Sequence, residues 1–306
     1  MFAQPPPPIA DISTSISFCR YLNVHIPVER FPHVIPRARG DSGNSEMCSS
    51  VHSSPPSEAG ICVVPPRGRY LASGFTAFIY QDGDIILKCP KNLPDSDPES
   101  NQLFQDLVNN ERAIYERLGP HAGILTYYGV DEPTGATKLE YANDGDLSDY
   151  IKSQPPPSEA RRVEMIRFLA TTWLHIYTSH VSIQDIKTDN ILVRDGVPKV
   201  ADFTDSVVFE DECPRDDLRS DLLGIGCVIY SIATWDVFGF DWGEGNRWPG
   251  PDQFRPVDNV LFGDVIAKCW TGDYDSMNGL YGDVVRLAAG FGASTASGIV
   301  PPFPAE

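Results

Sequence analysis

The pattern of apolar and polar residues predicts a β-rich first part and a helical second part in this chain of 306 residues. Strands are expected at about 70–80, 85–88, 124–130 and 136–141. The turn between the first two, at residues 81–84, contains Asp82-Gly83, which is typical of a hairpin. The polar, glycine-containing stretch 143–146 then breaks the regular structure, so we expect a hinge between the two parts there.

A helix expected at about 100–118 carries a carboxylate within its apolar face. The stripe at helical spacing comprises Phe104, Val108, Glu111 and Tyr115. Because an unpaired buried charge costs a great deal of free energy, Glu111 requires a partner of opposite charge. Lys88 lies on the preceding strand, and we therefore predict that it pairs with Glu111.

The second part is expected to be mainly helical. Helices are predicted at about 147–152, from the N-cap Ser158 to 179, at 222–233, and at one or two places within 259–269 and 282–289. The helix that begins at Asp221 is apolar on every side, so it should form the buried axis of this part.

Two segments outside this pattern are expected to lack regular structure. Residues 1–68 are rich in proline and serine, which break helices and strand ladders, and we interpret them as a disordered arm. Residues 290–306 are interpreted as a flexible tail. The folded domain is therefore expected at 69–289.

The net charge of -18 argues against nucleic acid or an anionic membrane as a main partner, because both require a basic surface. Seven cysteines occur without a CxxC pair, which is typical of reduced thiols inside the cell. The first residues lack the features of a signal peptide, and the longest apolar stretch, 222–233, is too short to span a bilayer. We expect a location in the cytoplasm or the nucleus.

The candidate chemistry is concentrated between Asp185 and Asp202. Lys187 follows Asp185 by two residues, and Asn190 comes three residues later. Two carboxylates and an amide at the ends of a predicted hairpin suit Mg²⁺, which prefers hard oxygen ligands and shares them with phosphates and water. Since Lys187 can also neutralise a phosphate, the pattern predicts phosphoryl transfer.

Taken in order, these residues resemble the catalytic pattern of the eukaryotic protein kinase family over about 69–289. The layout is similar to that of small, divergent kinase-like proteins of filamentous fungi. The resemblance implies an α+β, two-lobed fold with a small antiparallel β-rich N-lobe that contains one helix, and a mainly helical C-lobe. The N-lobe would cover 69–142, the hinge about 140–146 and the C-lobe 147–289. ATP and Mg²⁺ are the implied cofactors, and a protein is the implied substrate.

The resemblance also implies roles around the nucleotide. Lys88 would contact the α- and β-phosphates, and Glu111 would hold it in place. Gly74 would belong to the loop that covers the phosphates. Three further residues would bind the nucleotide: Glu140 and Ala142 through the hinge backbone, and Asp146 at the ribose.

For the transfer step, the resemblance implies that Asp185 is the base that orients the acceptor hydroxyl. Lys187 would steady the transferred phosphoryl group, while Asn190 and Asp202 would hold Mg²⁺. Asp221 matches the acid that braces the catalytic loop from below, and we also expect it to cap its own helix. The Asp185-x-Lys187 pattern is that of the serine/threonine type.

Several positions depart from the family pattern. Ala72 and Ala77 replace two of the three glycines of the phosphate loop, which should make that loop stiffer. Gln184 replaces the arginine that receives a phosphorylated activation loop, and Thr204 replaces the glycine that follows Asp-Phe. The segment before Asp221 is short and contains no Ala-Pro-Glu sequence. We therefore expect no control by phosphorylation of an activation loop.

Three functions are compatible with these features. An active Ser/Thr protein kinase that uses MgATP is favoured, because no catalytic side chain of the family pattern is missing. A pseudokinase scaffold would bind nucleotide without transferring phosphate, in keeping with the altered phosphate loop. The third is a small-molecule kinase on the same fold, although such enzymes usually lack a lysine two residues after the catalytic aspartate.

Overall fold

The computed structural model describes residues 67–93, 98–240 and 248–294. The expected disordered arm, residues 1–68, lies outside these ranges apart from its last two residues, and so does 295–306 of the expected tail. The beginning of that tail was predicted wrongly, because the last helix continues to Ser294. Phe291 packs against the core there, with its ring centroid 6.1 Å from that of Phe262.

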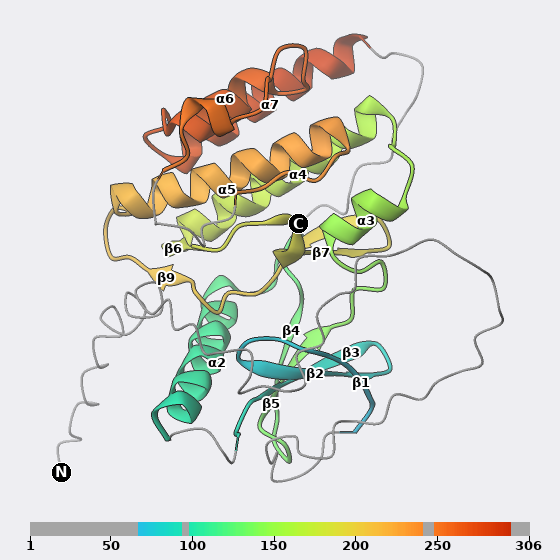
Figure 1. Cartoon of the computed structure of the whole chain (residues 1–306), viewed down its shortest axis with the longest axis vertical. Coiled ribbons are helices and arrows are strands. Elements are labelled where there is room, and N and C mark those ends of the chain that lie inside the picture. Colours follow the sequence, from blue (N-terminus) through green and yellow to red (C-terminus); the bar gives the residue numbers. More distant parts are fainter. Residues whose placement is uncertain (1–66, 94–97, 241–247, 295–306) are drawn as a thin grey trace. The chain divides into compact units, whose positions relative to one another are not determined.

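The N-terminal part of the described chain is an antiparallel sheet of five strands with one helix (Figure 1). The strands are β1 (Arg69–Ser73), β2 (Ala77–Asp82), β3 (Ile85–Pro90), β4 (Tyr127–Asp131) and β5 (Ala136–Glu140). Their order across the sheet is β1-β2-β3-β5-β4. The helix α2 (Pro98–Leu118) packs against β3 and β4 through its apolar face.

The first predicted strand is in fact two strands. β1 ends at Ser73 and β2 begins at Ala77, and between them the Gly74 N–H donates to the Ala77 carbonyl at 2.9 Å. The hairpin between β2 and β3 was predicted correctly: Asp82 pairs with Ile85 across the turn. Gly83 has a φ of 62°, a left-handed conformation that glycine adopts without strain.

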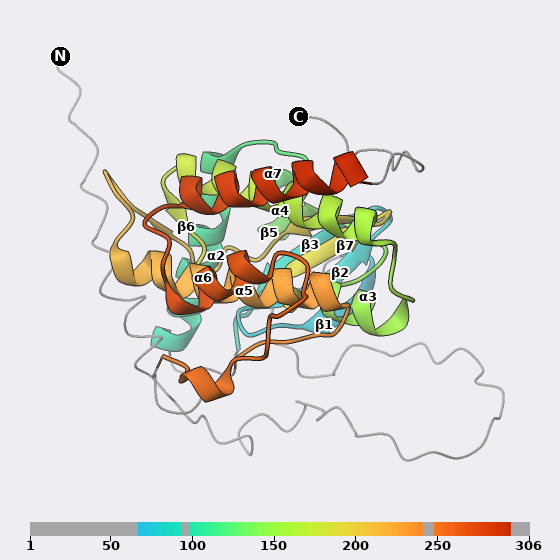
Figure 2. The same cartoon turned by 90° about the horizontal axis from the view of Figure 1, so that it is seen from above.

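The C-terminal part is mainly helical, as predicted. Its helices are α3 (Leu147–Ser153), α4 (Glu159–Thr178), α5 (Arg215–Thr234), α6 (Gly263–Thr271) and α7 (Met277–Ser294), with short 3-10 turns at η2 (Thr188–Asn190) and η3 (Pro251–Gln253). The two views show α4 and α5 side by side, with α7 along α4 and α6 beside α5 (Figures 1 and 2).

Two small antiparallel pairs lie between α4 and α5 in the sequence. They are β6 (Val181–Ser182) with β9 (Val207–Val208), and β7 (Ile191–Arg194) with β8 (Val197–Val200). The candidate catalytic residues lie in the loop that joins β6 to β7 and just after β8. Their positions therefore depend on how these short strands are fixed to the helices.

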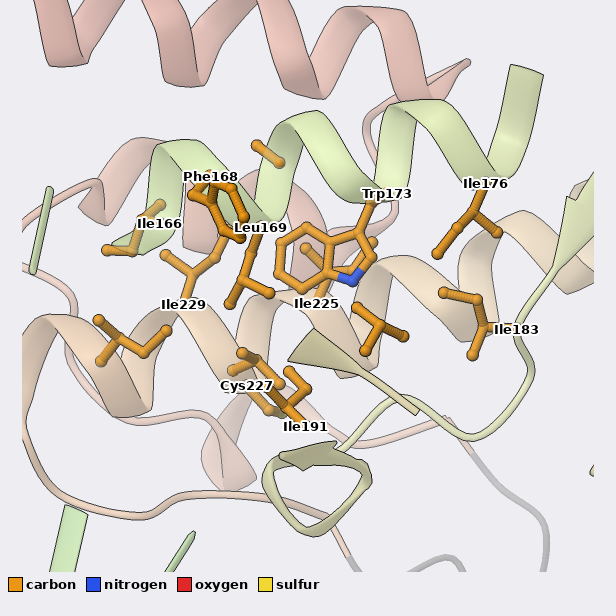
Figure 3. Close-up of a cluster of buried hydrophobic side chains, with 14 of the residues drawn as sticks. Ile166, Phe168, Leu169, Trp173, Ile176, Ile183, Ile191, Ile225, Cys227 and Ile229 are labelled. Carbon is orange, nitrogen blue, oxygen red and sulfur yellow. The ribbon is translucent and has the colours of Figure 1, made fainter. Parts of the chain in front are cut away.

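The core of the helical part lies directly beneath that loop. Trp173, 1% exposed, points from α4 toward α5 and packs beside Leu169 and Ile225 (Figure 3). Ile183 and Ile191, at the two ends of the loop, are also buried in this cluster. The loop is thus tied to the largest apolar core of the described chain at both ends.

The helix α5 is the buried axis that the sequence predicted, but it begins earlier than expected. Thirteen of its 20 residues are buried, and they lie on every side of the helix. It starts at Arg215, so Asp221 lies in its second turn and is not its N-cap. The Arg215 guanidinium donates to the carbonyls of Gly272 and Tyr274, which fixes the first turn through contacts distant in sequence.

The described chain confirms the predicted α+β fold with two lobes, a β-rich one with a single helix and a mainly helical one. Within the described ranges, no helix combines the length and the apolar character needed to cross a membrane.

Candidate active site

Lys88 on β3 and Glu111 on α2 form a buried ion pair. The Lys88 Nζ donates to Glu111 Oε1 at 2.9 Å and lies 2.8 Å from Oε2. The Glu111 side chain is completely buried, so the ammonium group provides the partner that a carboxylate there requires. The structure brings together the two residues that the apolar stripe of α2 predicted as partners.

The same ammonium group also contacts Asp202, which follows β8. Lys88 Nζ lies 3.0 Å from Asp202 Oδ1, and the Thr204 hydroxyl donates to that oxygen at 2.6 Å. Burial alone would raise the pKa of Asp202, but the charge of Lys88 and the hydrogen bond from Thr204 hold it below its ordinary value. Burial alone would lower the pKa of Lys88, but the two carboxylates outweigh this effect and raise it. Both groups therefore carry their charges at neutral pH.

Asp185, Lys187 and Asn190 meet within the catalytic loop. Lys187 Nζ donates to Asp185 Oδ2 at 2.6 Å, and Asn190 Nδ2 donates to the same oxygen at 2.8 Å. Asn190 Nδ2 also donates to the Asp185 carbonyl at 2.9 Å, which closes the loop on itself. The structure therefore brings the three predicted residues together, with Lys187 and Asn190 both bound to the Asp185 carboxylate.

Asn190 and Asp202 are suited to the metal role that the resemblance assigned to them. Because the amide nitrogen of Asn190 is used by Asp185, its Oδ1 remains as a neutral oxygen donor. Oδ1 of Asp202 accepts hydrogen bonds from Lys88 and Thr204. Within the described residues, its Oδ2 has no hydrogen-bond partner. The described residues contain no group of three or more acidic, histidine or cysteine side chains that could hold a metal. A donor set this small fits Mg²⁺, which usually keeps waters and substrate phosphates as its other ligands.

Asp221 on α5 supports the catalytic loop from below. Its Oδ2 accepts hydrogen bonds from the Tyr177 hydroxyl at 2.6 Å, the Ser182 hydroxyl at 2.8 Å and the Ile183 N–H at 2.8 Å. Its Oδ1 accepts from the Gln184 N–H at 2.7 Å. Burial raises the pKa of Asp221, and the four donors oppose that effect by stabilising the carboxylate. The predicted brace is confirmed, although the predicted cap is not.

A close contact between α5 and the loop lies one turn further along. A Cβ atom added to Gly224 would come within 2.4 Å of the Ile186 carbonyl oxygen. Only glycine therefore allows α5 to approach the residue that follows Asp185 so closely.

The Glu140 side chain is turned toward the helical part of the molecule. Glu140 Oε1 lies 3.0 Å from Arg194 Nη1, and its Oε2 lies 3.2 Å from Lys199 Nζ. Thr126 donates to the same Oε2 from its N–H at 3.2 Å and from its hydroxyl at 2.9 Å. The Glu140 N–H also donates to the Thr126 carbonyl at 2.9 Å, so neither its side chain nor its N–H is free for the nucleotide role predicted for it.

The other residues predicted to bind the nucleotide each have different surroundings. Ala142 lies at the edge of the core, and among the described residues its N–H has no hydrogen-bond acceptor. Asp146 caps α3, with Oδ1 accepting from the Asp149 N–H at 2.8 Å. Gly74 sits in the turn between β1 and β2, next to Phe75, whose exposed ring packs edge-on against Phe104 of α2.

A cavity of about 680 Å³ lies among residues 115–127, His175 and Lys199, and it includes none of the predicted site residues. It borders the site through Tyr115, whose ring packs edge-on against Phe203 with the centroids 5.0 Å apart, and through Thr126 and Lys199, which contact Glu140. The cavity is therefore not the pocket predicted for the nucleotide.

Two contributors to the site were not identified from the sequence. Thr204 was noted only as a replacement for glycine, yet its hydroxyl binds the Asp202 carboxylate. Asn110 was not singled out, yet its amide donates to the carbonyls of Thr204 and Ser206. Asn110 directly precedes Glu111, but consecutive residues on a helix point about 100° apart, so this position alone did not predict the contact.

Replacing Glu140 with glutamine should lower the free energy of unfolding at pH 7 by about 2 kcal/mol, less than the loss expected for a fully buried ion pair. Burial alone would raise the pKa of Glu140, but the Thr126 N–H and the charge of Lys199 hold it below its ordinary value. A lowered pKa stabilises the fold above the unfolded-state value, and that stabilisation disappears as the pH falls through the folded-state value.

The difference between wild type and Glu140→Gln should therefore be full near neutral pH and shrink below about pH 4. Urea unfolding at a series of pH values measures it, with the exposed Glu132→Gln as the matched control. A difference that stays constant down to pH 3 would contradict this role for the carboxylate.

Comparison with known proteins agrees with this site. A family model described as the protein kinase domain matches residues 83–222. The MAP kinase kinase kinase wis4 of Schizosaccharomyces pombe is 27% identical over 219 residues, which cover 67% of this chain and 15% of that protein. The human MAPK/MAK/MRK overlapping kinase is 29% identical over 164 residues, covering 44% of this chain and 39% of that protein.

A third relative is the serine/threonine-protein kinase RAD53 of Saccharomyces cerevisiae, 28% identical over 102 residues, which cover 33% of this chain and 12% of that protein. The chain thus spans less than half the length of each of these relatives. Together with the two-lobed fold and the residues gathered around Lys88 and Asp185, these matches support the assignment of residues 83–222 to the protein kinase-like superfamily.

Proposed function

We propose that the chain is an ATP-dependent protein kinase that transfers the γ-phosphate to serine or threonine hydroxyls. The observation that carries the proposal is the simultaneous contact of Lys88 with Glu111 and Asp202, which joins both lobes at one charged cluster. The Ser/Thr preference is supported by the Asp185-x-Lys187 pattern and by relatives named as serine/threonine-protein kinases. ATP is supported by the hinge, where the Ala142 N–H is available to a ligand.

In this proposal Asp185 accepts the proton of the acceptor hydroxyl while the oxygen bonds to the γ-phosphorus. The bond from that phosphorus to the bridging oxygen breaks, and ADP leaves. Lys88 holds the non-transferred phosphates, and Lys187 neutralises charge on the transferred group. Mg²⁺, held by Asn190 and Asp202, would screen the phosphate charges when bound. The chain's contribution is mainly position and electrostatics.

We also infer that this activity is not controlled by phosphorylation of an activation loop. Eighteen residues separate Asp202 from Asp221, and Gln184 occupies the place of the phosphate-receiving arginine. The Gln184 side chain instead donates to the Ser182 hydroxyl at 2.5 Å. The side chain that stands in place of the arginine is thus already bound within the catalytic loop.

The cytoplasm or the nucleus is the proposed location. The four cysteines in the described part of the chain are all free thiols, which suits a reducing compartment. The net charge of -18 favours a protein partner over nucleic acid or an anionic membrane.

A pseudokinase scaffold is the second candidate. It is favoured by the loop between β1 and β2, where Gly74 does not adopt a positive φ and Ala72 and Ala77 lie in the strands on either side. Such a loop closes less readily on phosphates. A pseudokinase would bind ATP but show no turnover.

Replacing Lys88 with methionine should lower phosphate transfer from γ-labelled ATP to a broad protein panel by about a hundredfold, because one preorganised charge is removed. Lys138→Met, on the neighbouring strand β5, is the matched control and should transfer at the wild-type rate. Thermal melting of each variant reports folding separately. Wild-type protein that binds ATP but transfers no phosphate would support the scaffold, and transfer to metabolites without transfer to proteins would support a small-molecule kinase.

A further inference from the structure

One of the side chains of α2 that contact the segment after Asp202 is Asn110. Asn110 Nδ2 donates to the Thr204 carbonyl at 3.2 Å and to the Ser206 carbonyl at 3.0 Å. Asn110 directly precedes Glu111, the partner of Lys88. The Asn110 amide therefore links the helix that presents Glu111 to the segment that contains Asp202, in addition to the packing of Tyr115 against Phe203.

The same segment is fixed at two further points. The Thr204 hydroxyl donates to Asp202 Oδ1 at 2.6 Å, and the Lys88 ammonium lies 3.4 Å from that hydroxyl. Ser206 is completely buried, and its hydroxyl donates to the Ile183 carbonyl at 3.1 Å, two residues before Asp185. Residues 204–206 thus contact α2, the candidate metal ligand and the catalytic loop.

These contacts constrain which oxygen of Asp202 is available. Oδ1 is shared by Lys88 and Thr204, which leaves Oδ2 as the oxygen without a hydrogen-bond donor among the described residues. Asp202 has a φ of 60°, a left-handed conformation uncommon for a residue other than glycine, so its orientation depends on the surrounding contacts. A hydroxyl group two residues away supplies one of those contacts.

We propose that Thr204 and Asn110 are positioning residues: the Thr204 hydroxyl orients the Asp202 carboxylate for Mg²⁺, and Asn110 keeps the segment docked on α2 without modification. The inference rests on the proposed function, since it concerns the metal and nucleotide of that site. It adds that Thr204, which stands where the family pattern has a glycine, donates a hydrogen bond to the Asp202 carboxylate. This hydrogen bond is present in the unmodified chain.

The test compares ATP with Mg²⁺ and ATP with EDTA as probes of the full-length chain, using calorimetric titration. Thr204→Val should weaken MgATP binding about tenfold, equivalent to about 1.4 kcal/mol, while leaving metal-free ATP binding unchanged. Thr204→Ser keeps the hydroxyl and should bind MgATP within about twofold of wild type. Melting without nucleotide reports whether each variant is folded.

Asn110→Ala provides a second measurement that does not need the metal. Amides of residues 203–209 should exchange with deuterium faster than in wild type, because the segment loses two hydrogen bonds to α2. The exposed neighbour Asn109→Ala is the matched control and should exchange as wild type does. This comparison stands even if Thr204→Val does not fold.

The outcomes separate the two proposals. If wild type binds no ATP with or without Mg²⁺, the proposed function fails and the inference fails with it. If wild type binds MgATP but Thr204→Val binds it equally well, or loses both probes alike, the positioning role of Thr204 is overturned and the proposed function stands. Unchanged exchange in Asn110→Ala overturns the docking role of Asn110.

Discussion

Replacing Asp185 with asparagine is expected to lower the rate of phosphate transfer by about a thousandfold, the scale of a lost general base. The asparagine keeps the shape of the side chain but has neither the negative charge nor a site for the proton of the acceptor hydroxyl. Lys187, which donates to Asp185 Oδ2 at 2.6 Å, would lose its charged partner as well. Transfer from γ-labelled ATP at saturating nucleotide measures the effect.

The loss should be one of rate, without a loss of folding or nucleotide binding. The Asp185 side chain is 39% exposed, and substitutions at such positions usually change stability by about 0.5 kcal/mol or less. Asp189→Asn, an exposed carboxylate four residues later, is the control that should retain the wild-type rate. Equal rates for wild type and Asp185→Asn would show that any observed transfer does not use this residue.

The second large effect is expected on stability. Replacing Asp221 with alanine should lower the free energy of unfolding by about 4 kcal/mol, because each buried donor left unpaired costs roughly 1–3 kcal/mol. Four donors lose their acceptor: the hydroxyls of Tyr177 and Ser182, and the N–H groups of Ile183 and Gln184. A cavity is also left in the core beneath the catalytic loop.

Urea unfolding measures this effect, with m-values checked to be unchanged. Asp216→Ala removes an exposed carboxylate from the first turn of the same helix and should cost no more than about 1 kcal/mol. A loss below 1 kcal/mol for Asp221→Ala would mean that the loop keeps its hydrogen bonds by other means. The Gln184 backbone, with a φ of 72°, should be the first part of the loop to change, since its N–H loses the Asp221 acceptor.

The parts of the site that could be predicted from the sequence are those set by local pattern. The Lys88–Glu111 pair followed from one carboxylate on an apolar stripe, because helical spacing and the cost of a buried charge leave few solutions. The cluster around Asp185 followed from close spacing along the chain, where Asn190 is only five residues away. Short separations leave the backbone few conformations to choose from.

The parts that could not be predicted depend on contacts distant in sequence. Arg194 and Lys199, the partners of Glu140, lie more than fifty residues further along the chain. The start of α5 at Arg215 depends on carbonyls near residue 272, and no side-chain cap marks it. The break between β1 and β2 was missed because the intervening turn contains a single glycine and no other turn residue.

The helix α5 carries both contacts that lie beneath the catalytic loop, Asp221 and Gly224, three residues apart and so on one face. An inserted or deleted residue near the start of α5 would rotate that face by about 100° relative to the part of α5 that precedes the change. Both contacts would then leave the loop together. The chain should therefore tolerate changes of length in the exposed stretch 210–212 far better than between Arg215 and Asp221. Between Arg215 and Asp221, adding or removing one residue should break the Asp221 hydrogen bonds and the close approach of Gly224 together.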